Sequence, residues 1–464
     1  MNQDTICAVS TAPGTGGIAV IRVSGTSAIR IVNGIFYPLK KGKSLTRQPA
    51  YSLVYGSIRN EDAILDEVLV ALFRAPHSFT GEDTVEITCH GSVYIQQQIL
   101  QLLIGNGCRA ALPGEFTQRA FLNGKMDLSQ AEAVADLIAS TTAGTHRLAL
   151  SQMRGGFSNE LTELRKQLLD FTSLIELELD FSEEEIEFAN RFDLKQLAAG
   201  IEQLIHRLMD SFSVGNAVKN GIPVAIIGET NAGKSTLLNL LLNEEKAIVS
   251  DIHGTTRDVI EDTVNLSGIT FRFIDTAGIR DTSDTIESLG IERTFLKLEQ
   301  ASIVLWVIDI AATESQLNVL AKQILPKIEG KKLILICNKS DLLSSEELVR
   351  RQQSLLPEIT VPRIYISAKN NINVHVLHEQ LLVAANLPEI GQNDVIVTNV
   401  RHFEALSKAK EAIIRVLEGL DIGISGDFLS QDIRECMHYL GEITGQISND
   451  EILGNIFSKF CIGK

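Results

Sequence analysis

Residues 223–242 read PVAIIGETNAGKSTLLNLLL, and this stretch decides the fold of the central part of the chain. An apolar strand leads into Gly228-Glu-Thr-Asn-Ala-Gly-Lys-Ser235, which fits the phosphate-binding pattern G-x-x-x-x-G-K-[ST], and an apolar helix follows. The glycines let backbone N–H groups approach a phosphate, Lys234 supplies positive charge to the β and γ groups, and the Ser235 hydroxyl can ligate Mg²⁺. The pattern predicts a nucleoside triphosphate site at the end of a strand in an α/β sheet.

Three further segments follow predicted strands and indicate that the base is guanine. Asp275-Thr-Ala-Gly278 follows TFRFI, which places a carboxylate near the metal and a glycine N–H near the γ-phosphate. Asn338-Lys-Ser-Asp341 follows LILIC, and its aspartate can accept both N–H groups of a guanine edge, which adenine does not offer. Ser367-Ala-Lys369 follows RIYI and can support the base. Each motif stands at the carboxyl end of a strand, where open α/β sheets bind ligands, so we expect GTP binding. The predicted contacts in these four motifs are Gly228, Asn231, Ala232, Gly233, Lys234, Ser235, Thr236, Asp275, Thr276, Ala277, Gly278, Asn338, Lys339, Ser340, Asp341, Ser367, Ala368 and Lys369.

The loop Gly254-Thr-Thr-Arg-Asp258 lies between the first and second of these motifs. A threonine there can complete the Mg²⁺ shell when the γ-phosphate is present, so the loop is predicted to switch between two states. Ras-like enzymes place a water-orienting glutamine after the D-x-x-G glycine, but here the residue is Ile279. Candidate replacements are Asp281, Asp284 and Glu287, and the residues alone do not rank them.

Composition limits the class of protein. The 464 residues are enough for about three domains. The net charge is 42 − 58 = −16, and no segment predicts a broad surface for polyanions, so any RNA contact must be local or shared with a second protein. No apolar run is long enough for a membrane span, and MNQDTICAVS is unlike a signal peptide, so we expect a cytoplasmic protein. The cysteines are far apart, which predicts reduced thiols rather than a disulfide framework or a zinc ribbon: Cys7, Cys89, Cys108, Cys337, Cys436 and Cys461.

The patterning divides the chain into four segments. Residues 1–120 mix β-branched runs with one helical pattern, which predicts an α+β domain. Residues 121–215 and 381–464 have apolar residues three or four apart and predict amphipathic helices. Residues 216–380 alternate strands and helices, as in a mostly parallel sheet covered on both faces. We therefore expect a multidomain α/β and α+β protein, in which a P-loop α/β domain is inserted into a discontinuous helical domain.

The chain resembles the MnmE (TrmE) family of tRNA modification GTPases over essentially its whole length. The resemblance rests on DTICAVSTAPGTGGIAVIRVSG, SFTGEDTVEITCHG, PGEFTQRAFLNGKMDLSQAEAVADLI, DIHGTTRD, DTAGIRDTSDTIESLGIER and the terminal FCIGK. It implies an N-terminal domain that binds formyl-tetrahydrofolate and dimerises, a discontinuous helical domain and an inserted Ras-like G domain. This architecture agrees with the periodicity.

The same resemblance implies a GTPase that is activated when two G domains dimerise, with K⁺ supplying the positive charge that an arginine finger supplies elsewhere. The matching K⁺ ligands are Asn231, Ser250, Ile252 and Thr255, and the matching Mg²⁺ ligands are Ser235 and Thr256. Glu287 matches the carboxylate that orients the water, and Lys234 is the second catalytic residue. The GTP-binding set extends over the switch loop to Ser250, Asp251, Ile252, His253, Gly254, Thr255 and Thr256.

For the 5-formyltetrahydrofolate site, the positions that match the family are Arg22, Glu86, Lys125 and Lys464. Cations suit a ligand with a glutamate tail, and a carboxylate suits the pterin N–H edge. Cys461 stands near this set and is included as a candidate site residue, although a small buried apolar role is the common fate of a free cysteine. The implied activity is the addition of an aminomethyl or carboxymethylaminomethyl group at C5 of the wobble uridine of tRNA. It would be carried out by a homodimer in a heterotetramer with an FAD-dependent MnmG-type partner.

Two other functions fit parts of the pattern. The G domain also resembles those of Era-like proteins, which would make the chain a regulatory GTPase in ribosome assembly, although no KH-type G-x-x-G loop or basic tail follows it. The second alternative is a folate-binding enzyme whose G domain serves only to hold two copies of the chain together as a dimer. A Glu287→Ala variant that hydrolyses GTP poorly yet supports modification would favour this alternative.

Overall fold

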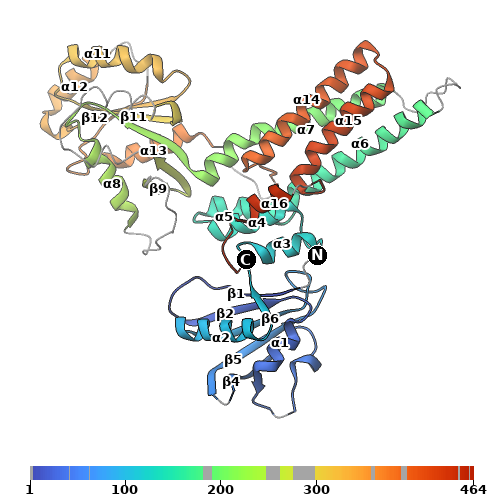
Figure 1. The fold of residues 1–464 in the computed structure, drawn as a ribbon. Helices are drawn as coiled ribbons and strands as arrows, with labels where there is room; N and C mark the ends of the chain where they lie inside the picture. The colour runs from blue at the N-terminus through green and yellow to red at the C-terminus, as the bar shows by residue number, and fades with distance from the viewer. Residues whose placement is uncertain are drawn as a thin grey trace. The chain divides into compact units, whose positions relative to one another are not determined.

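The computed structural model describes residues 4–40, 42–61, 63–180, 191–246, 262–274, 298–356, 361–387, 394–447, 450–458 and 460–463 (Figure 1). The chain divides into two compact units. Residues 1–139, 149–206 and 404–464 form the first unit, and residues 140–148 and 207–403 form the second.

The N-terminal part of the first unit is an α+β domain, as predicted (Figure 1). Its seven-stranded sheet has the order β3-β4-β5-β6-β2-β1-β7, in which β1 and β7 are parallel and the other neighbours are antiparallel. Two helices cover one face and bury Val32, Ile99 and Leu103 against the sheet. The strands are β1 (Thr5–Val9), β2 (Gly16–Ser24), β3 (Phe36–Pro38), β4 (Ser52–Asn60), β5 (Ala63–Phe73), β6 (Thr84–Gly91) and β7 (Cys108–Ala110); the helices are α1 (Ala28–Ile35), the 3-10 turn η1 (Leu45–Arg47) and α2 (Val93–Gly105).

Helices that precede and follow residues 216–380 in the chain pack together, as expected for a discontinuous helical domain. Helix α15 lies along α6, where Arg165 donates from Nε to the Met437 carbonyl at 3.0 Å (Figure 1). None of the helices within the described ranges has an apolar stretch long enough to cross a membrane. The helices are α3 (Glu115–Leu122), α4 (Leu128–Ala139), α5 (Ala143–Met153), α6 (Gly156–Asp180), α7 (Arg191–Asn220), α14 (Val400–Ile422), α15 (Gly426–Thr444) and α16 (Asp450–Ser458).

The second unit holds a six-stranded sheet with the order β13-β12-β11-β8-β10-β9 (Figure 1). All neighbours are parallel except the edge pair β10 and β9. Helices α8 and α13 bury their apolar residues on one face of this sheet, and α11 on the other, as the alternating pattern predicts. The elements are β8 (Ile222–Ile227), α8 (Lys234–Lys246), β9 (Asp262–Leu266), β10 (Ile269–Phe273), β11 (Ile303–Asp309), α11 (Glu314–Ile324), η3 (Leu325–Lys327), β12 (Lys332–Asn338), η4 (Ser340–Leu342), α12 (Ser345–Ser354), β13 (Arg363–Tyr365) and α13 (Val374–Ala385).

Candidate functional site

The phosphate loop leaves β8 at Gly228 and enters α8 at Lys234. Gly228 has φ +146°, and a Cβ there would lie 2.0 Å from the Val307 carbonyl oxygen, so no other residue fits. The Lys234 ammonium donates to the carbonyls of Gly228 at 2.8 Å and Glu229 at 2.7 Å. Strand, loop and helix therefore hold this cation within the loop, where the β and γ phosphates of a nucleotide would bind.

The far side of the loop is shaped by Asn231 and Gly233. Asn231 is exposed and adopts the left-handed backbone with φ 64°, while Ala232 beside it is buried. Gly233 has φ +97°, and a Cβ there would lie 2.1 Å from Nδ2 of Asn338. This close approach is the local reason for the second glycine of the motif. Ser235 and Thr236 follow in the first turn of α8. The N–H groups at the start of a helix point along its axis and favour an anion.

Asn338 joins the phosphate loop to the loop after β13. Its Nδ2 donates to the Ala232 carbonyl at 2.8 Å, and its Oδ1 accepts from the Ala368 N–H at 3.0 Å. The side chain is buried, so both groups would be left unsatisfied without these partners. Ser340 adds a third link by donating its N–H to the Ile366 carbonyl at 3.0 Å. These contacts bring three of the four predicted motifs to one edge of the sheet.

The residues expected to bind the guanine base include both charged and exposed side chains. Lys339 has φ 64°, and its ammonium pairs with Oδ2 of Asp309 at 2.7 Å. Asp341 is exposed in the turn η4, where its carboxylate can accept hydrogen bonds from a base. Ser367 is buried, and its hydroxyl accepts from the Asn370 N–H at 3.3 Å, whereas Lys369 is exposed.

Several predicted residues lie outside the described residues. They belong to the switch loop, the D-x-x-G motif, the candidate catalytic carboxylates and the C-terminus: Ser250, Asp251, Ile252, His253, Gly254, Thr255, Thr256, Asp275, Thr276, Ala277, Gly278, Asp281, Asp284, Glu287 and Lys464. The structure does place their neighbours. Ile274 follows β10 beside β8, donating its N–H to the Val224 carbonyl at 3.0 Å.

The donor set of the phosphate loop fits Mg²⁺. That ion prefers oxygen ligands and keeps waters and substrate phosphates rather than a full protein cage. A hydroxyl such as that of Ser235 therefore suits it. The described residues contain no group of three or more histidine, cysteine, aspartate or glutamate residues that could hold a metal ion.

In the N-terminal sheet, Arg22 on β2 is the register partner of Glu86 on β6. The Arg22 Nε donates to Glu86 Oε1 at 2.9 Å, and the two side chains are 14% and 27% exposed. The guanidinium lies 5.3 Å from the ring centre of Phe79 and 5.6 Å from that of Phe116, which fixes its orientation. The structure therefore brings two of the four predicted folate residues into direct contact.

The other folate candidates lie on neighbouring segments of the same unit. Lys125 donates from Nζ to the Pro76 carbonyl at 3.0 Å. At the C-terminus, the Gly463 carbonyl accepts from the Ser10 hydroxyl at 3.1 Å, which places the residue before Lys464 at the end of β1. Cys461 is exposed rather than buried, and its carbonyl accepts from the Gly114 N–H at 3.4 Å.

The sequence gives no sign of an ionic network that fixes α3 beside this site. Arg119 donates to Asp4 Oδ1 at 2.8 Å and to Glu82 Oε1 at 3.2 Å. It also donates to Glu115 Oε1 at 3.0 Å, and Arg109 donates to the same oxygen atom at 2.6 Å. Burial raises the pKa of Glu115, but the hydrogen bonds from Arg109, the Leu112 N–H and Arg119 outweigh it and hold that pKa below its usual value. No spacing rule predicts this network, because its members are up to 115 positions apart.

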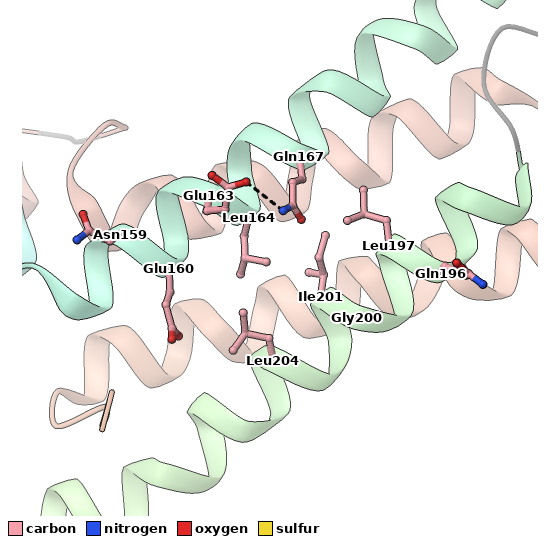
Figure 2. A pocket seen from close by; sticks show the side chains of 10 residues that line it. All are labelled: Asn159, Glu160, Glu163, Leu164, Gln167, Gln196, Leu197, Gly200, Ile201 and Leu204. Carbon is pink, nitrogen blue, oxygen red and sulfur yellow. Dashed lines mark hydrogen bonds between the residues drawn. The ribbon is translucent and has the colours of Figure 1, made fainter. Parts of the chain in front are cut away.

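A pocket of about 570 Å³ opens between α6 and α7 (Figure 2). Leu164, Leu197, Ile201 and Leu204 point into it, and Gln167 donates to Glu163 Oε1 at 3.1 Å on its rim (Figure 2). None of the predicted site residues lines this pocket.

Comparison with known proteins gives matches over the whole chain. A family model described as the MnmE helical domain matches residues 128–461, and one described as the GTP-binding protein TrmE N-terminus matches residues 5–125. The tRNA modification GTPase MnmE of a Bacteroides fragilis strain is 66% identical over 466 residues and that of Bacteroides thetaiotaomicron is 65% identical over 468 residues, each covering 100% of both chains. Among solved structures, Aquifex aeolicus Era bound to GDP and AlF4⁻ is 28% identical, with a TM-score of 0.28, and covers 41% of this chain and 66% of that one. That TM-score is low, so the G-domain fold rests on the strand order described above.

Proposed function

This chain belongs to the MnmE (TrmE) family of tRNA modification GTPases, and we propose that it hydrolyses GTP to drive modification of the wobble uridine of tRNA at C5. The buried Asn338 side chain carries the proposal, because it sets the distance between the loop for the phosphates and the loop for the base. A fixed distance of this kind suits a nucleotide that spans both loops. Mass spectrometry of the wobble uridines in tRNA from a strain that lacks this gene tests the proposal, and a normal modification profile would overturn it.

Each motif has a role in the proposed GTP site. Lys234 and the N–H groups at the start of α8 bind the phosphates, and Asp341 binds the guanine edge. Ser235 and Thr256 hold Mg²⁺, which neutralises charge that develops on the phosphates. Glu287 orients the attacking water, in place of the glutamine that Ile279 replaces.

We also propose that hydrolysis requires K⁺, held by Asn231, Ser250, Ile252 and Thr255 when two G domains meet. The bound ion supplies positive charge next to the transferring phosphoryl group. Asn231 supports this assignment, because it is an exposed residue of the phosphate loop, three positions before Lys234, and its side-chain oxygen can ligate a cation. Such a site needs two copies of the chain, so the proposal includes a homodimer.

GTP turnover should be at least about 10-fold faster in KCl than in NaCl at equal ionic strength, since an arginine finger in the same role is worth more than this. Phosphate release at saturating GTP measures it. The matched variant is Asn231→Gly, which removes the amide and keeps the left-handed backbone without strain. It should lose the difference between the two salts while still binding GTP. Equal rates of the wild type in the two salts would remove the K⁺ site.

The one-carbon unit of the modification would come from a formyl- or methylene-tetrahydrofolate in the N-terminal domain. Lys125 and Lys464 suit the carboxylates of the folate tail, and Glu86 suits the pterin N–H edge. Arg22 contacts Glu86, so its guanidinium would act at the same end of the ligand and orient that carboxylate. The nitrogen would come from ammonia or glycine, with an FAD-dependent MnmG-type partner in a heterotetramer. The proposal places this chemistry in the cytoplasm, with the tRNA.

Arg22→Ala should weaken 5-formyltetrahydrofolate binding by about 10- to 100-fold, the value of one charge-assisted hydrogen bond. The substitution also leaves Glu86 without the partner that orients it. Isothermal titration of the purified chain with the folate measures the effect. Arg59→Ala is the matched control, because Arg59 likewise lies over an aromatic ring, that of Tyr37, on the same sheet. A folate affinity that is the same in both variants would exclude Arg22 from the site.

A further inference from the structure

One stretch of the N-terminal sheet carries only positive charge although the chain is acidic. Residues 37–60 contain five basic residues and no acidic one, against 42 basic and 58 acidic residues in the whole chain. Four of the five lie in residues 39–48. We call the three that the structure describes the basic loop, namely Lys40, Lys43 and Arg47, whereas Lys41 lies outside the described residues. The side chains of Lys40, Lys43 and Arg47 are exposed, and none of these three pairs with an acidic group among the described residues.

The segment that carries the basic loop is fixed by one buried side chain and by hydrogen bonds from two neighbouring residues. Leu45 at its centre is only 1% exposed and packs in the core of the domain. Asn33 on α1 accepts from the Leu45 N–H at 2.8 Å and from the Ser44 hydroxyl at 2.9 Å. Arg74 donates to the loop carbonyls of residues 46 and 48 at 2.9 and 3.0 Å. The cations are therefore presented on an ordered backbone, which lowers the entropic cost of binding an anion.

The basic loop also lies close to the proposed folate site. The short segment 74–77 contacts both. Arg74 holds the loop as described, and two residues further on the Pro76 carbonyl accepts from Lys125, one of the folate residues. Two residues of extended chain span only about 7 Å. Tyr51 reaches the same segment, where its hydroxyl donates to the His77 carbonyl at 3.2 Å, and the residue is 69% exposed.

We propose that the basic loop binds the phosphate backbone of the tRNA substrate and holds the RNA beside the one-carbon site. The inference rests on the proposed function for the identity of the RNA. Unpaired cations bind phosphates, and an exposed tyrosine beside them offers a surface on which a base can stack. Because the chain as a whole has a net charge of −16, a local contact of this kind is the arrangement that lets it bind a polyanion. It also brings the RNA to the part of the molecule where the one-carbon unit is held.

The test is a salt titration of tRNA binding by the full-length chain. The variant Lys40→Gln/Lys43→Gln/Arg47→Gln removes three charges, and fluorescence anisotropy measures its affinity for an unmodified tRNA transcript from 50 to 200 mM KCl. We expect the affinity at low salt to fall about 30-fold or more, and the slope of log K against log salt to decrease by about 2 to 3 units, since each phosphate contact contributes nearly one. The variant Lys40→Arg/Lys43→Arg should bind as the wild type does, because any cation serves.

The matched control removes the same charge from other exposed lysines that have no partner within the described part of the chain, with Lys166→Gln/Lys322→Gln/Lys332→Gln. It should change neither the affinity nor the slope by more than a small factor, and GTP hydrolysis should be unchanged in both triple variants. The inference is wrong if the basic-loop variant binds tRNA with the wild-type affinity and slope, or if the wild-type chain binds no tRNA. If the basic-loop variant binds tRNA as the wild type does but no longer binds the flavin-dependent partner, the inference is also wrong, and the basic loop instead contacts an acidic surface of that protein. Wobble uridines that are normal in a deletion strain would instead reject the proposed function.

Discussion

Replacing Asp341 with asparagine should weaken GTP binding by about 100-fold or more and shift the preference of the site towards XTP, because two charge-assisted hydrogen bonds are lost. A carboxylate accepts from both N–H groups of guanine, whereas an amide offers one acceptor and one donor. Xanthine carries a carbonyl where guanine carries its amino group, so the amide donor of asparagine meets an acceptor. Asp341 is exposed in the turn after β12, and its substitution disturbs no packing.

Competition with a fluorescent GDP measures this preference for GTP, XTP and ATP. The control is Glu346→Gln, the same loss of charge at an exposed position five residues further on. It should leave the affinities for all three nucleotides unchanged. If Asp341→Asn retains tight GTP binding, the guanine edge lies elsewhere and the assignment of this motif is wrong.

Lys234→Ala should lower the rate of GTP hydrolysis by about 100- to 1,000-fold, the usual cost of one preorganised donor to the transition state. The effect has two parts. The ammonium that would stabilise charge on the β and γ phosphates is gone, and the carbonyls of Gly228 and Glu229 lose the donor that shapes the loop. Single-turnover phosphate release in KCl at saturating GTP measures the chemical step separately from nucleotide affinity.

Folding of the variant can be followed in the same sample, because the chain has a single tryptophan. Trp306 is fully buried in β11 of the G-domain sheet, so its emission reports on the core beside the site. Lys322→Ala, at an exposed position on α11, is the matched control and should hydrolyse GTP at the wild-type rate. Near-wild-type turnover by Lys234→Ala would contradict the proposed phosphate site.

Most of the G-domain fold is predictable because the central strands β8, β11 and β12 are long apolar runs, and a polar motif follows β8 and β12. The edge strand β9 (Asp262–Leu266) is not, since DTVNL contains only two apolar residues and its pairing depends on β10. In the N-terminal domain, β4 is also hard to predict from the sequence, because Gly56 and Ser57 interrupt its apolar pattern. In both cases the neighbouring strand, rather than local propensity, decides the structure.

The site is less predictable than the fold, because it depends on contacts between distant segments. The motif identifies Asn338, but only the structure shows that its amide joins Ala232 to Ala368. In the same way, Arg22 and Glu86 are 64 positions apart, and their contact follows from the register of β2 against β6. A sequence supplies residue types in order, whereas registers of this kind arise only when the sheet has formed.

The central claim is that GTP turnover in this G domain drives the modification of tRNA. Mass spectrometry of wobble uridines tests it most directly, in tRNA from cells whose only copy of the gene encodes either the wild type or Lys234→Ala. The account predicts C5-modified uridine with the wild type, and uridine without that group with Lys234→Ala, as in a strain that lacks the gene. Full modification in cells that carry only Lys234→Ala would contradict it.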